Sequence, residues 1–226
     1  MNERKTKEPQ YQNQLELRDT RGLTQLGLAT NRVWHDDPRR LLFILARHKF
    51  VAKMLSGKQR VLEVGCGDAF GTRIVLQEVG TICAIDFDPV FVKDVNERAE
   101  GRWRVDCKVH DILSGPMEER FEGAYSLDVI EHISKSDERV FLSNISRSLD
   151  DQGVMIIGTP SLQSQVYASK ASREGHVNCK DHMELKELMS EFFHNVFLFS
   201  MNDEVVHTGF YPLAHYFLAL GCSKKN

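Results

Sequence analysis

The 226-residue sequence lacks any run of apolar residues that approaches the roughly 20 needed for a helix to cross a bilayer. Its first residues, MNERKTKEPQYQNQ, are charged and polar and contain no apolar stretch, so we expect no secretory signal. It also lacks an excess of either charge, since the formal net charge is −3. Such a balance creates no positive field to attract nucleic acid or an anionic membrane, and we expect neither as a partner.

Cysteine is sparse, and its spacing suggests neither disulfides nor a redox motif. The five cysteines are odd in number and form no C-x-x-C pair. This pattern is typical of reduced thiols in a cytoplasmic protein. Cys66 lies between two glycines, where a small side chain suffices, so we expect it to pack rather than to do redox chemistry.

Strands and helices alternate along most of the chain, which predicts an α/β fold with a mostly parallel sheet covered on both faces. Residues 1–30 show weak periodicity and predict a loose or partly ordered extension that closes over a site. The last two strands are joined by about ten residues that include Pro212, too few for a crossover, so one of them should be antiparallel. The predicted strands are 61–64, 81–87, 103–110, 121–130, 154–160, 195–201 and 213–222, and the predicted helices are 39–55, 88–100, 135–149 and 181–193.

The stretch VLEVGCGDAFG, residues 61–71, carries the most specific signal. A buried strand runs into a turn where Gly65 and Gly67 allow a tight reversal and a close approach of the backbone to a ligand. With Gly71 the spacing is G-x-G-x-x-x-G rather than the G-x-G-x-x-G of dinucleotide-binding proteins. An acidic residue, Glu63, lies within the strand itself.

This stretch resembles motif I of the class I S-adenosylmethionine (SAM)-dependent methyltransferases, V-L-[DE]-[VI]-G-C-G-x-G, most closely from Val61 to Gly67. The sequence departs from the motif at Ala69, where that family most often has glycine; the alanine is tolerable if the turn ends at residue 67. The resemblance implies a Rossmann-like sheet of seven strands with one antiparallel, and SAM as cofactor with S-adenosylhomocysteine as product. It implies cofactor contacts from Glu63, Gly65, Cys66 and Gly67.

We expect one domain over residues 1–226. Its parts are an N-terminal extension and helix at 1–56, a cofactor-binding half at 57–160, and a substrate-side insert with the last strands at 161–226.

Further cofactor contacts are expected where the next strands end. Asp86 follows the glycine turn by about twenty residues and is placed to accept hydrogen bonds from a ribose diol, whereas Asp88 is better placed to cap the following helix. Phe87 either offers an apolar face to an adenine ring or packs in the core. The resemblance assigns Asp111 and Ile112 to the adenine, although Asp111 also suits the start of a surface loop.

The resemblance assigns the methionine end of SAM to Leu127 and Asp128. The segment then gives the Asp-x-x-Glu-His pattern that is common in small-molecule O-methyltransferases such as those of ubiquinone synthesis. His132 in this pattern is a candidate general base, because imidazole removes protons near neutral pH. The alternative is that His132 hydrogen-bonds to backbone and stiffens the loop.

A long non-periodic insert follows Gly158-Thr159-Pro160 and holds several polar and aromatic side chains. Loops of this length in a compact domain are commonly functional. The segment around His176 resembles the histidine-bearing stretch that faces the substrate in many small-molecule methyltransferases, so we favour His176 as a catalytic base. Tyr167 and His182 are candidate substrate contacts. We expect no metal site, because His176, Cys179 and His182 are only three donors and their spacing fits no familiar zinc motif.

Trp34 and His35, directly before the first predicted helix, are further substrate candidates as part of a lid, although Trp34 suits ordinary packing equally well.

The function predicted from these residues is methyl transfer from SAM to a small molecule, and we favour a hydroxyl of a sugar, quinone or secondary metabolite as the acceptor. The preference for oxygen rests on the histidine-rich insert. The alternatives are N-methylation, methylation of a protein side chain, and SAM binding without catalysis. The glycine spacing and Glu63 disfavour a NAD-dependent oxidoreductase. The Asn/Asp-Pro-Pro-Tyr/Phe motif of enzymes that methylate nucleic-acid amines is missing, so we expect no nucleic-acid substrate.

Overall fold

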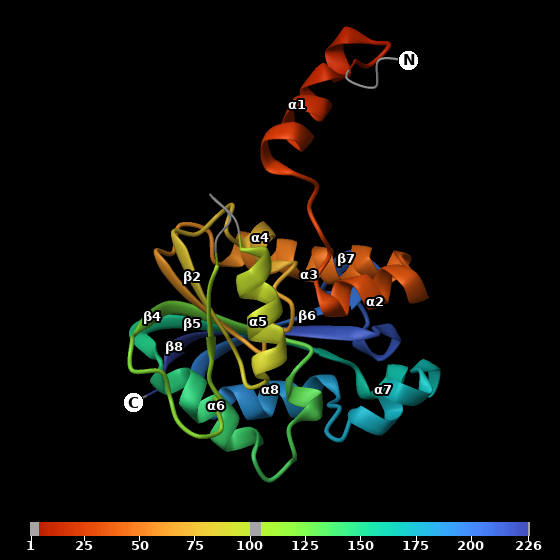
Figure 1. Ribbon diagram of the computed structural model, residues 1–226. Coiled ribbons are helices and arrows are strands. Elements are labelled where there is room, and N and C mark those ends of the chain that lie inside the picture. The colour runs from red at the N-terminus through yellow and green to blue at the C-terminus, as the bar shows by residue number, and fades with distance from the viewer. Residues whose placement is uncertain (1–4, 100–104, 226) are drawn as a thin grey trace.

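The computed structural model of the protein describes residues 5–99 and 105–225 (Figure 1). The N-terminal part is more helical than expected. Helix α1 projects away from the body of the molecule and has no buried residue, whereas α2 and α3 lie against the body. The segment expected to be loose or partly ordered, residues 1–30, is thus helical over 9–21 and 28–30, whereas residues 1–4 lie outside the described residues. The elements here are the 3-10 helix η1 (Pro9–Tyr11), α1 (Gln12–Arg21), α2 (Leu28–Asp36) and α3 (Arg39–Met54).

The centre of the molecule is a mixed sheet with the strand order β3-β2-β1-β4-β5-β8-β6-β7. The five strands from β3 to β5 pair in parallel, and β8 is inserted antiparallel between β5 and β6. The predicted fold class and the antiparallel strand are thus confirmed. The strands are β1 (Arg60–Val64), β2 (Thr81–Asp86), β3 (Asp106–Val109), β4 (Phe121–Leu127), β5 (Leu149–Pro160), β6 (Phe193–Asn202), β7 (Val205–His207) and β8 (Tyr216–Lys224).

The predicted count of seven strands is wrong, because the structure adds a short eighth strand. After β6 the chain reverses at Asp203 and Glu204, and β7 pairs antiparallel with the strand it has just left. Asp203 takes the left-handed conformation that such a tight reversal needs, with φ of +50°. A three-residue strand is too short to show an alternating pattern in the sequence. Residues 103 and 104 of the third predicted strand lie outside the described residues.

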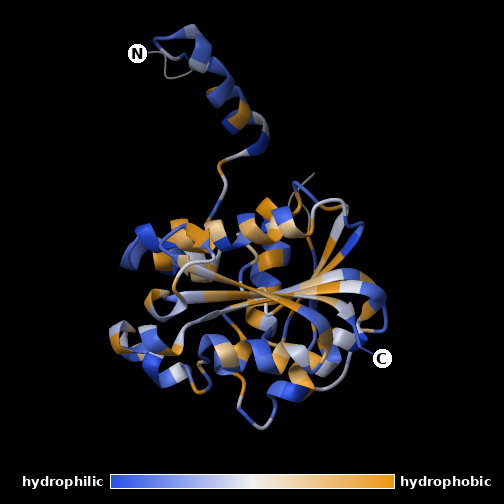
Figure 2. Cartoon of the chain, turned by 180° about the vertical axis from the view of Figure 1, so that it is seen from behind, coloured by the Kyte–Doolittle hydropathy of each residue, from blue (hydrophilic) through white to orange (hydrophobic). Residues whose placement is uncertain are grey.

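Helices cover both faces of the sheet, and the strand residues alternate between the two cores. Leu62 and Val64 face the core formed with α6 and α8, whereas Val61 faces the core formed with α3, α4 and α5. Figure 2 shows the result as hydrophobic strands enclosed by helices whose outer faces are hydrophilic. The helices are α4 (Thr72–Val75), α5 (Pro89–Arg98), α6 (Glu138–Arg147) and α8 (His182–Ser190).

The predicted irregular insert contains two short helices and is closed at its base. Ser161 pairs with Lys180 in an isolated parallel bridge, so the two ends of the insert lie together. The remaining short elements are η3 (Ile130–His132), η4 (Leu162–Tyr167), α7 (Lys170–Gly175) and η5 (Tyr211–Leu213). Among the described residues, no helix has both the length and the apolar character needed to cross a membrane.

Candidate functional site

The glycine turn at the end of β1 has the geometry that its sequence predicts, and it extends further. Gly65 and Gly67 have φ of +73° and +52°, and a Cβ on Gly65 would lie 2.4 Å from Cγ2 of Val129. Ala69 also has a positive φ, +49°. The turn therefore does not end at residue 67, and Ala69 adopts a conformation that favours glycine.

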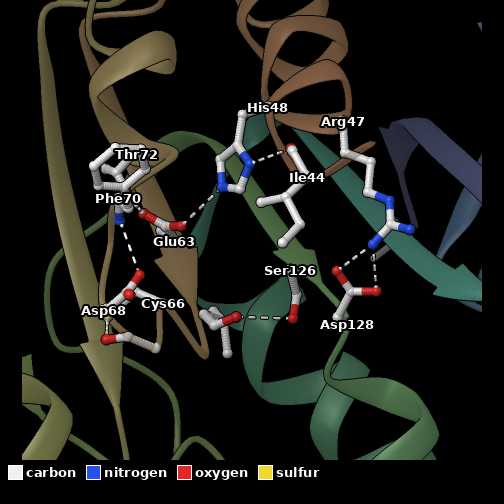
Figure 3. Close-up of polar contacts among 12 residues, drawn as sticks. Ile44, Arg47, His48, Glu63, Cys66, Asp68, Phe70, Thr72, Ser126 and Asp128 are labelled. Carbon is white, nitrogen blue, oxygen red and sulfur yellow. Dashed lines mark hydrogen bonds and ion pairs between the residues drawn. The ribbon is translucent and has the colours of Figure 1, made fainter. Parts of the chain in front are cut away.

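Two other motif I residues are held inside the protein. Glu63 is buried; its carboxylate accepts a hydrogen bond from Oγ1 of Thr72 at 2.5 Å and lies 3.7 Å from Nε2 of His48 (Figure 3). The Sγ atom of Cys66 lies 3.7 Å from that of Cys107. Contact with the Cys107 thiol and burial both raise the pKa of Cys66, so this thiol stays protonated, as a packing residue would.

Asp86, at the end of β2, is joined directly to the glycine turn. One carboxylate oxygen accepts from the backbone N–H of Gly67 at 2.9 Å, and the other accepts from the N–H of Asp88 at 3.0 Å. As predicted, it is Asp88 that caps α5, by accepting from the N–H of Val90. A carboxylate has about four lone-pair directions. Two of those of Asp86 remain for a ribose diol, so the turn and Asp86 together fit a nucleoside-bearing cofactor.

The predicted adenine contacts lie at the same edge of the sheet. The N–H of His110 donates to the backbone oxygen of Asp86 at 3.0 Å, which brings the end of β3 beside the end of β2. Phe87 is 73% exposed, so it is not a core aromatic. Asp111 is exposed and its side chain accepts from the N–H of Leu113, while Ile112 is buried. These positions are compatible with a cofactor role for Phe87 and Asp111, and equally with Asp111 starting a surface loop.

The end of β4 contains an ion pair that the sequence did not reveal. The predicted strand over 121–130 stops at Leu127, because Asp128 turns the chain with φ of +57°. Arg47, on α3, binds both carboxylate oxygens of Asp128 at 2.7 and 2.8 Å (Figure 3). The guanidinium also lies 3.7 Å from the centre of the Tyr216 ring. Residues from α3, from the turn after β4 and from β8 are thereby fixed together beside the glycine turn.

Glu131 follows in the 3-10 turn η3 and is 1% exposed. Its carboxylate accepts a hydrogen bond from Oγ1 of Thr159 at 3.2 Å. Burial and the nearby negative charge of Asp128 raise the pKa of Glu131 to about 8. A carboxylate kept in such an environment at a strand end is typical of a functional site.

His132 and His176, 44 positions apart in the sequence, are brought together. Their ring centres lie 5.0 Å apart in an edge-to-face arrangement. Nδ1 of His132 lies 2.8 Å from the backbone oxygen of Gly175, and Nδ1 of His176 lies 2.9 Å from Oε1 of Gln165. Burial and the neighbouring His132 lower the pKa of His176, so its ring is neutral at pH 7. The two predicted catalytic candidates thus share one site, and the predicted alternative of a backbone contact by His132 is also present.

The insert is fastened to this site by its own backbone. The N–H groups of Val177 and Asn178 donate to the backbone oxygen of Glu131 at 2.8 and 3.0 Å. His176 therefore directly precedes a segment that is hydrogen-bonded to the turn that carries Glu131 and His132. Its position relative to these two residues is set by main-chain contacts.

The four predicted substrate residues are less closely gathered. Trp34 and His35 are exposed on α2, and Tyr167 is 90% exposed in η4. His182 is the first residue of α8 and stacks on Tyr211 with the ring centres 4.3 Å apart.

A cavity of about 590 Å³ lies next to the glycine turn, but on its α4 and α5 side. Asp68, Ala69 and Phe70 form part of its wall, together with Arg21 at the end of α1 and residues 22–25 that follow it. Its lining includes neither Gly67, Asp86 nor the two histidines. We therefore place the functional site at the strand ends rather than in this cavity.

Residues 61–153 match the family model described as a methyltransferase domain. A curated relative from Mycolicibacterium smegmatis, a probable SAM-dependent methyltransferase, is 27% identical over 139 residues, which cover 60% of this chain and 48% of the relative. A relative from Mycobacterium tuberculosis, also a probable SAM-dependent methyltransferase, is 26% identical over 119 residues, which cover 51% of this chain and 42% of that protein. The chain spans about half the length of the curated relatives it matches.

Solved structures share the fold at low identity. The N-methyltransferase NodS from Bradyrhizobium japonicum, in complex with S-adenosylhomocysteine, matches with a TM-score of 0.62 and 18% identity, over 85% of this chain and 90% of that one. The plantazolicin methyltransferase BpumL, also with S-adenosylhomocysteine, matches with a TM-score of 0.64 and 11% identity, over 86% and 88% of the two chains.

Proposed function

Because the chain belongs to the class I SAM-dependent methyltransferase superfamily, we propose that it transfers a methyl group from SAM to a hydroxyl of a small-molecule acceptor. We choose a hydroxyl because two histidines, His132 and His176, lie together beside the end of β4, where one of them can act as a base. When bound, SAM supplies a methyl carbon whose bond to sulfur breaks as the acceptor atom forms its new bond.

In this proposal the strand ends hold the cofactor. Asp86 accepts hydrogen bonds from the ribose hydroxyls, and Phe87 covers the adenine. The backbone of the glycine turn lies against the methionine part of the cofactor, supported by the buried Glu63 and by Cys66. The remaining contacts are Asp111 and Ile112 for the adenine and Leu127 and Asp128 for the methionine end. Residues 57–160 form the cofactor-binding half, while 1–56 and 161–226 supply the acceptor side.

The histidines act on the acceptor. A neutral hydroxyl is a weak nucleophile, and a positioned base raises its rate of reaction by roughly 10²–10⁴. The lowered pKa of His176 keeps its ring neutral at pH 7, so Nε2 is free to accept the hydroxyl proton. Tyr167, Trp34 and His35 are exposed and suited to acceptor contact, whereas His182 contributes mainly by packing on Tyr211.

An amine acceptor is the second candidate, since NodS, an N-methyltransferase, has the same fold. An amine that is already deprotonated needs no base, so N-methylation would depend less on the histidines.

The cofactor part is tested by thermal unfolding with SAM, S-adenosylhomocysteine and NAD added separately. A ligand at a hundredfold excess over its Kd adds about 2.7 kcal/mol of stability. We expect this gain with the two adenosyl-sulfur ligands and none with NAD. Asp86→Ala should weaken their binding by about 2–4 kcal/mol, because it removes charge-assisted hydrogen bonds, whereas Asp151→Ala, at an exposed position of β5, should not. A gain with NAD alone would contradict the proposal.

The acceptor part is tested by methyl transfer from labelled SAM to panels of hydroxyl and amine compounds. His176→Ala should keep the affinity for S-adenosylhomocysteine and lower turnover on a hydroxyl at least about 100-fold. Full turnover in this variant would exclude His176 from the chemistry, and the same comparison with His132→Ala tests its partner.

A further inference from the structure

Three potential metal ligands meet at the site described above. One carboxylate oxygen of Glu131, one ring nitrogen of His132 and one of His176 all lie within 4.8 Å of one another. Two of these residues come from η3 and the third follows α7, and main-chain hydrogen bonds to Glu131 fix the second segment on the first. The three donors therefore belong to a site whose backbone is already assembled.

The hydrogen bonds of the two imidazoles decide which nitrogen is available. Nδ1 of His132 faces the backbone oxygen of Gly175, and Nδ1 of His176 faces Oε1 of Gln165. Both of these oxygens are acceptors only, so each Nδ1 carries the hydrogen and each Nε2 carries a lone pair. An imidazole whose other N–H is held by a carbonyl oxygen is the usual form of a metal-binding histidine.

No cation of the described residues is in direct contact with the carboxylate of Glu131, although the charge of Arg47 acts on it from a distance. Among the ion pairs of residues 5–99 and 105–225, none includes Glu131. The neighbouring guanidinium of Arg47 is engaged by both oxygens of Asp128. A buried carboxylate is costly unless it is paired or coordinates a metal, and Glu131 is 1% exposed.

We propose that Glu131, His132 and His176 bind one divalent first-row metal ion, through one carboxylate oxygen and the two Nε2 atoms. Two histidines and one carboxylate are a ligand set found in both zinc and non-haem iron enzymes, and they leave coordination positions open. This is a different set from His176, Cys179 and His182, which gave no reason to expect a metal in the sequence; in the structure His182 is engaged with Tyr211.

The ion would activate the acceptor hydroxyl in the proposed methyl transfer, and this part of the inference rests on that proposed function. An acceptor hydroxyl bound at an open position has a lowered pKa and loses its proton to solvent water. The oxygen then forms a bond to the methyl carbon while the carbon–sulfur bond breaks, and sulfur keeps the electron pair. With the ion bound, both Nε2 atoms are occupied as ligands, so the ion replaces the histidine base of the proposed function while the reaction and the hydroxyl acceptor stay the same.

The experiment is a titration with Co²⁺, in the absence of SAM, of the whole protein after dialysis against EDTA. Visible ligand-field absorption reports the bound ion. We expect one saturable Co²⁺ per chain, and an affinity at least tenfold weaker in each of His132→Ala, His176→Ala and Glu131→Gln. His194→Ala, an exposed histidine of β6, is the matched control and should bind as the wild type does. The near-ultraviolet band of a cobalt–thiolate bond should be missing.

Gln165 gives a second measurement that does not alter a ligand. Gln165→Leu removes the acceptor for Nδ1 of His176 and should weaken Co²⁺ binding by about 10–100-fold. Gln165→Glu keeps an acceptor there and should retain the affinity. Binding that is unchanged in both histidine variants, a missing saturable site, or a thiolate band that disappears in Cys179→Ser would each overturn the inference.

Failure of this inference and failure of the proposed function give different results. Methyl transfer by a protein without a Co²⁺ site would leave the proposed function intact and reject the metal. Co²⁺ binding by these residues, without stabilisation by SAM or S-adenosylhomocysteine, would keep the metal site and reject the methyltransferase.

Discussion

Glu131 and Glu138 are only seven positions apart and both are buried, yet their surroundings are opposite. Glu138, at the start of α6, pairs with Nζ of the buried Lys180 and accepts from the side-chain nitrogen of Asn178 at 2.8 Å. Burial alone would raise the pKa of Glu138, but Lys180 and Asn178 outweigh it and lower the pKa. Glu131 accepts from the hydroxyl of Thr159 but, within residues 5–99 and 105–225, has no lysine or arginine in direct contact, and burial and the charge of Asp128 raise its pKa.

The same insert supplies the partners of both glutamates. Its base, at Asn178 and Lys180, neutralises Glu138 and so fastens the insert to α6. Two positions earlier, His176 faces Glu131 without neutralising it. The difference separates a structural role from a functional one. A fully paired carboxylate stabilises the fold, whereas an uncompensated carboxylate is a candidate for binding and chemistry.

The largest expected effect comes from breaking the paired side. Lys180→Met leaves Glu138 buried without its cation, and the free energy of unfolding at pH 7 should fall by about 3–5 kcal/mol. Urea unfolding measures this fall. The double variant Lys180→Met/Glu138→Leu should regain most of the loss, since no charge remains buried. Lys170→Met, in an exposed pair with Glu174, should change stability by no more than about 0.5 kcal/mol. A similar small change for Lys180→Met would show that the pair is not structural.

A smaller effect follows from the lowered pKa of Glu138. The unfolded chain binds this proton more readily than the folded chain does, so the contribution of the pair is complete above the unfolded pKa of about 4.3 and is lost as the pH falls through the lower folded value. Each unit by which the pKa is lowered accounts for about 1.4 kcal/mol. Urea unfolding between pH 7 and pH 3 should therefore show a steeper loss in the wild type than in the uncharged double variant. Parallel curves would contradict this assignment.

The smallest effect on stability is expected on the uncompensated side. Glu131→Gln breaks no direct ion pair of the described residues, and the amide oxygen still accepts from the hydroxyl of Thr159. The free energy of unfolding at pH 7 should therefore change by no more than about 1 kcal/mol. Methyl transfer should nevertheless be lost. A destabilisation as large as that of Lys180→Met would show that Glu131 is a structural residue, and the contrast between the two glutamates would disappear.

The parts of the molecule that could be predicted from the sequence are those fixed by local chemistry. Gly65 and Gly67 can be recognised because a tight turn at a strand end favours glycine, and Asp86 because it ends the next strand; the N–H of Gly67 donates to Asp86. The nearly continuous apolar run in β1 likewise predicts a strand buried on both faces.

The remaining features depend on contacts between distant segments. Arg47 and Asp128 are 81 positions apart, and neither position shows a pattern that indicates the other. The meeting of His132 with His176 depends on how the insert folds back, which no periodicity encodes. The conformation of Ala69 was also missed, since an alanine at a positive φ is imposed by its surroundings and not by its own preference.

The start of α2 has a consequence for the order in which the chain acquires structure during synthesis. Its N-terminal residue is preceded by Gly27, which has no side chain to cap the helix; the N–H of Thr30 donates instead to Asp68, and that of Leu28 to Asp94. These carboxylates lie 38 and 66 positions further along the chain, so at about 5–20 residues per second the ribosome delivers the later one several seconds after α2. A nine-residue helix is marginal on its own in water. Helix α2 therefore emerges before the glycine turn and α5, and its first turn is complete only when both have been made.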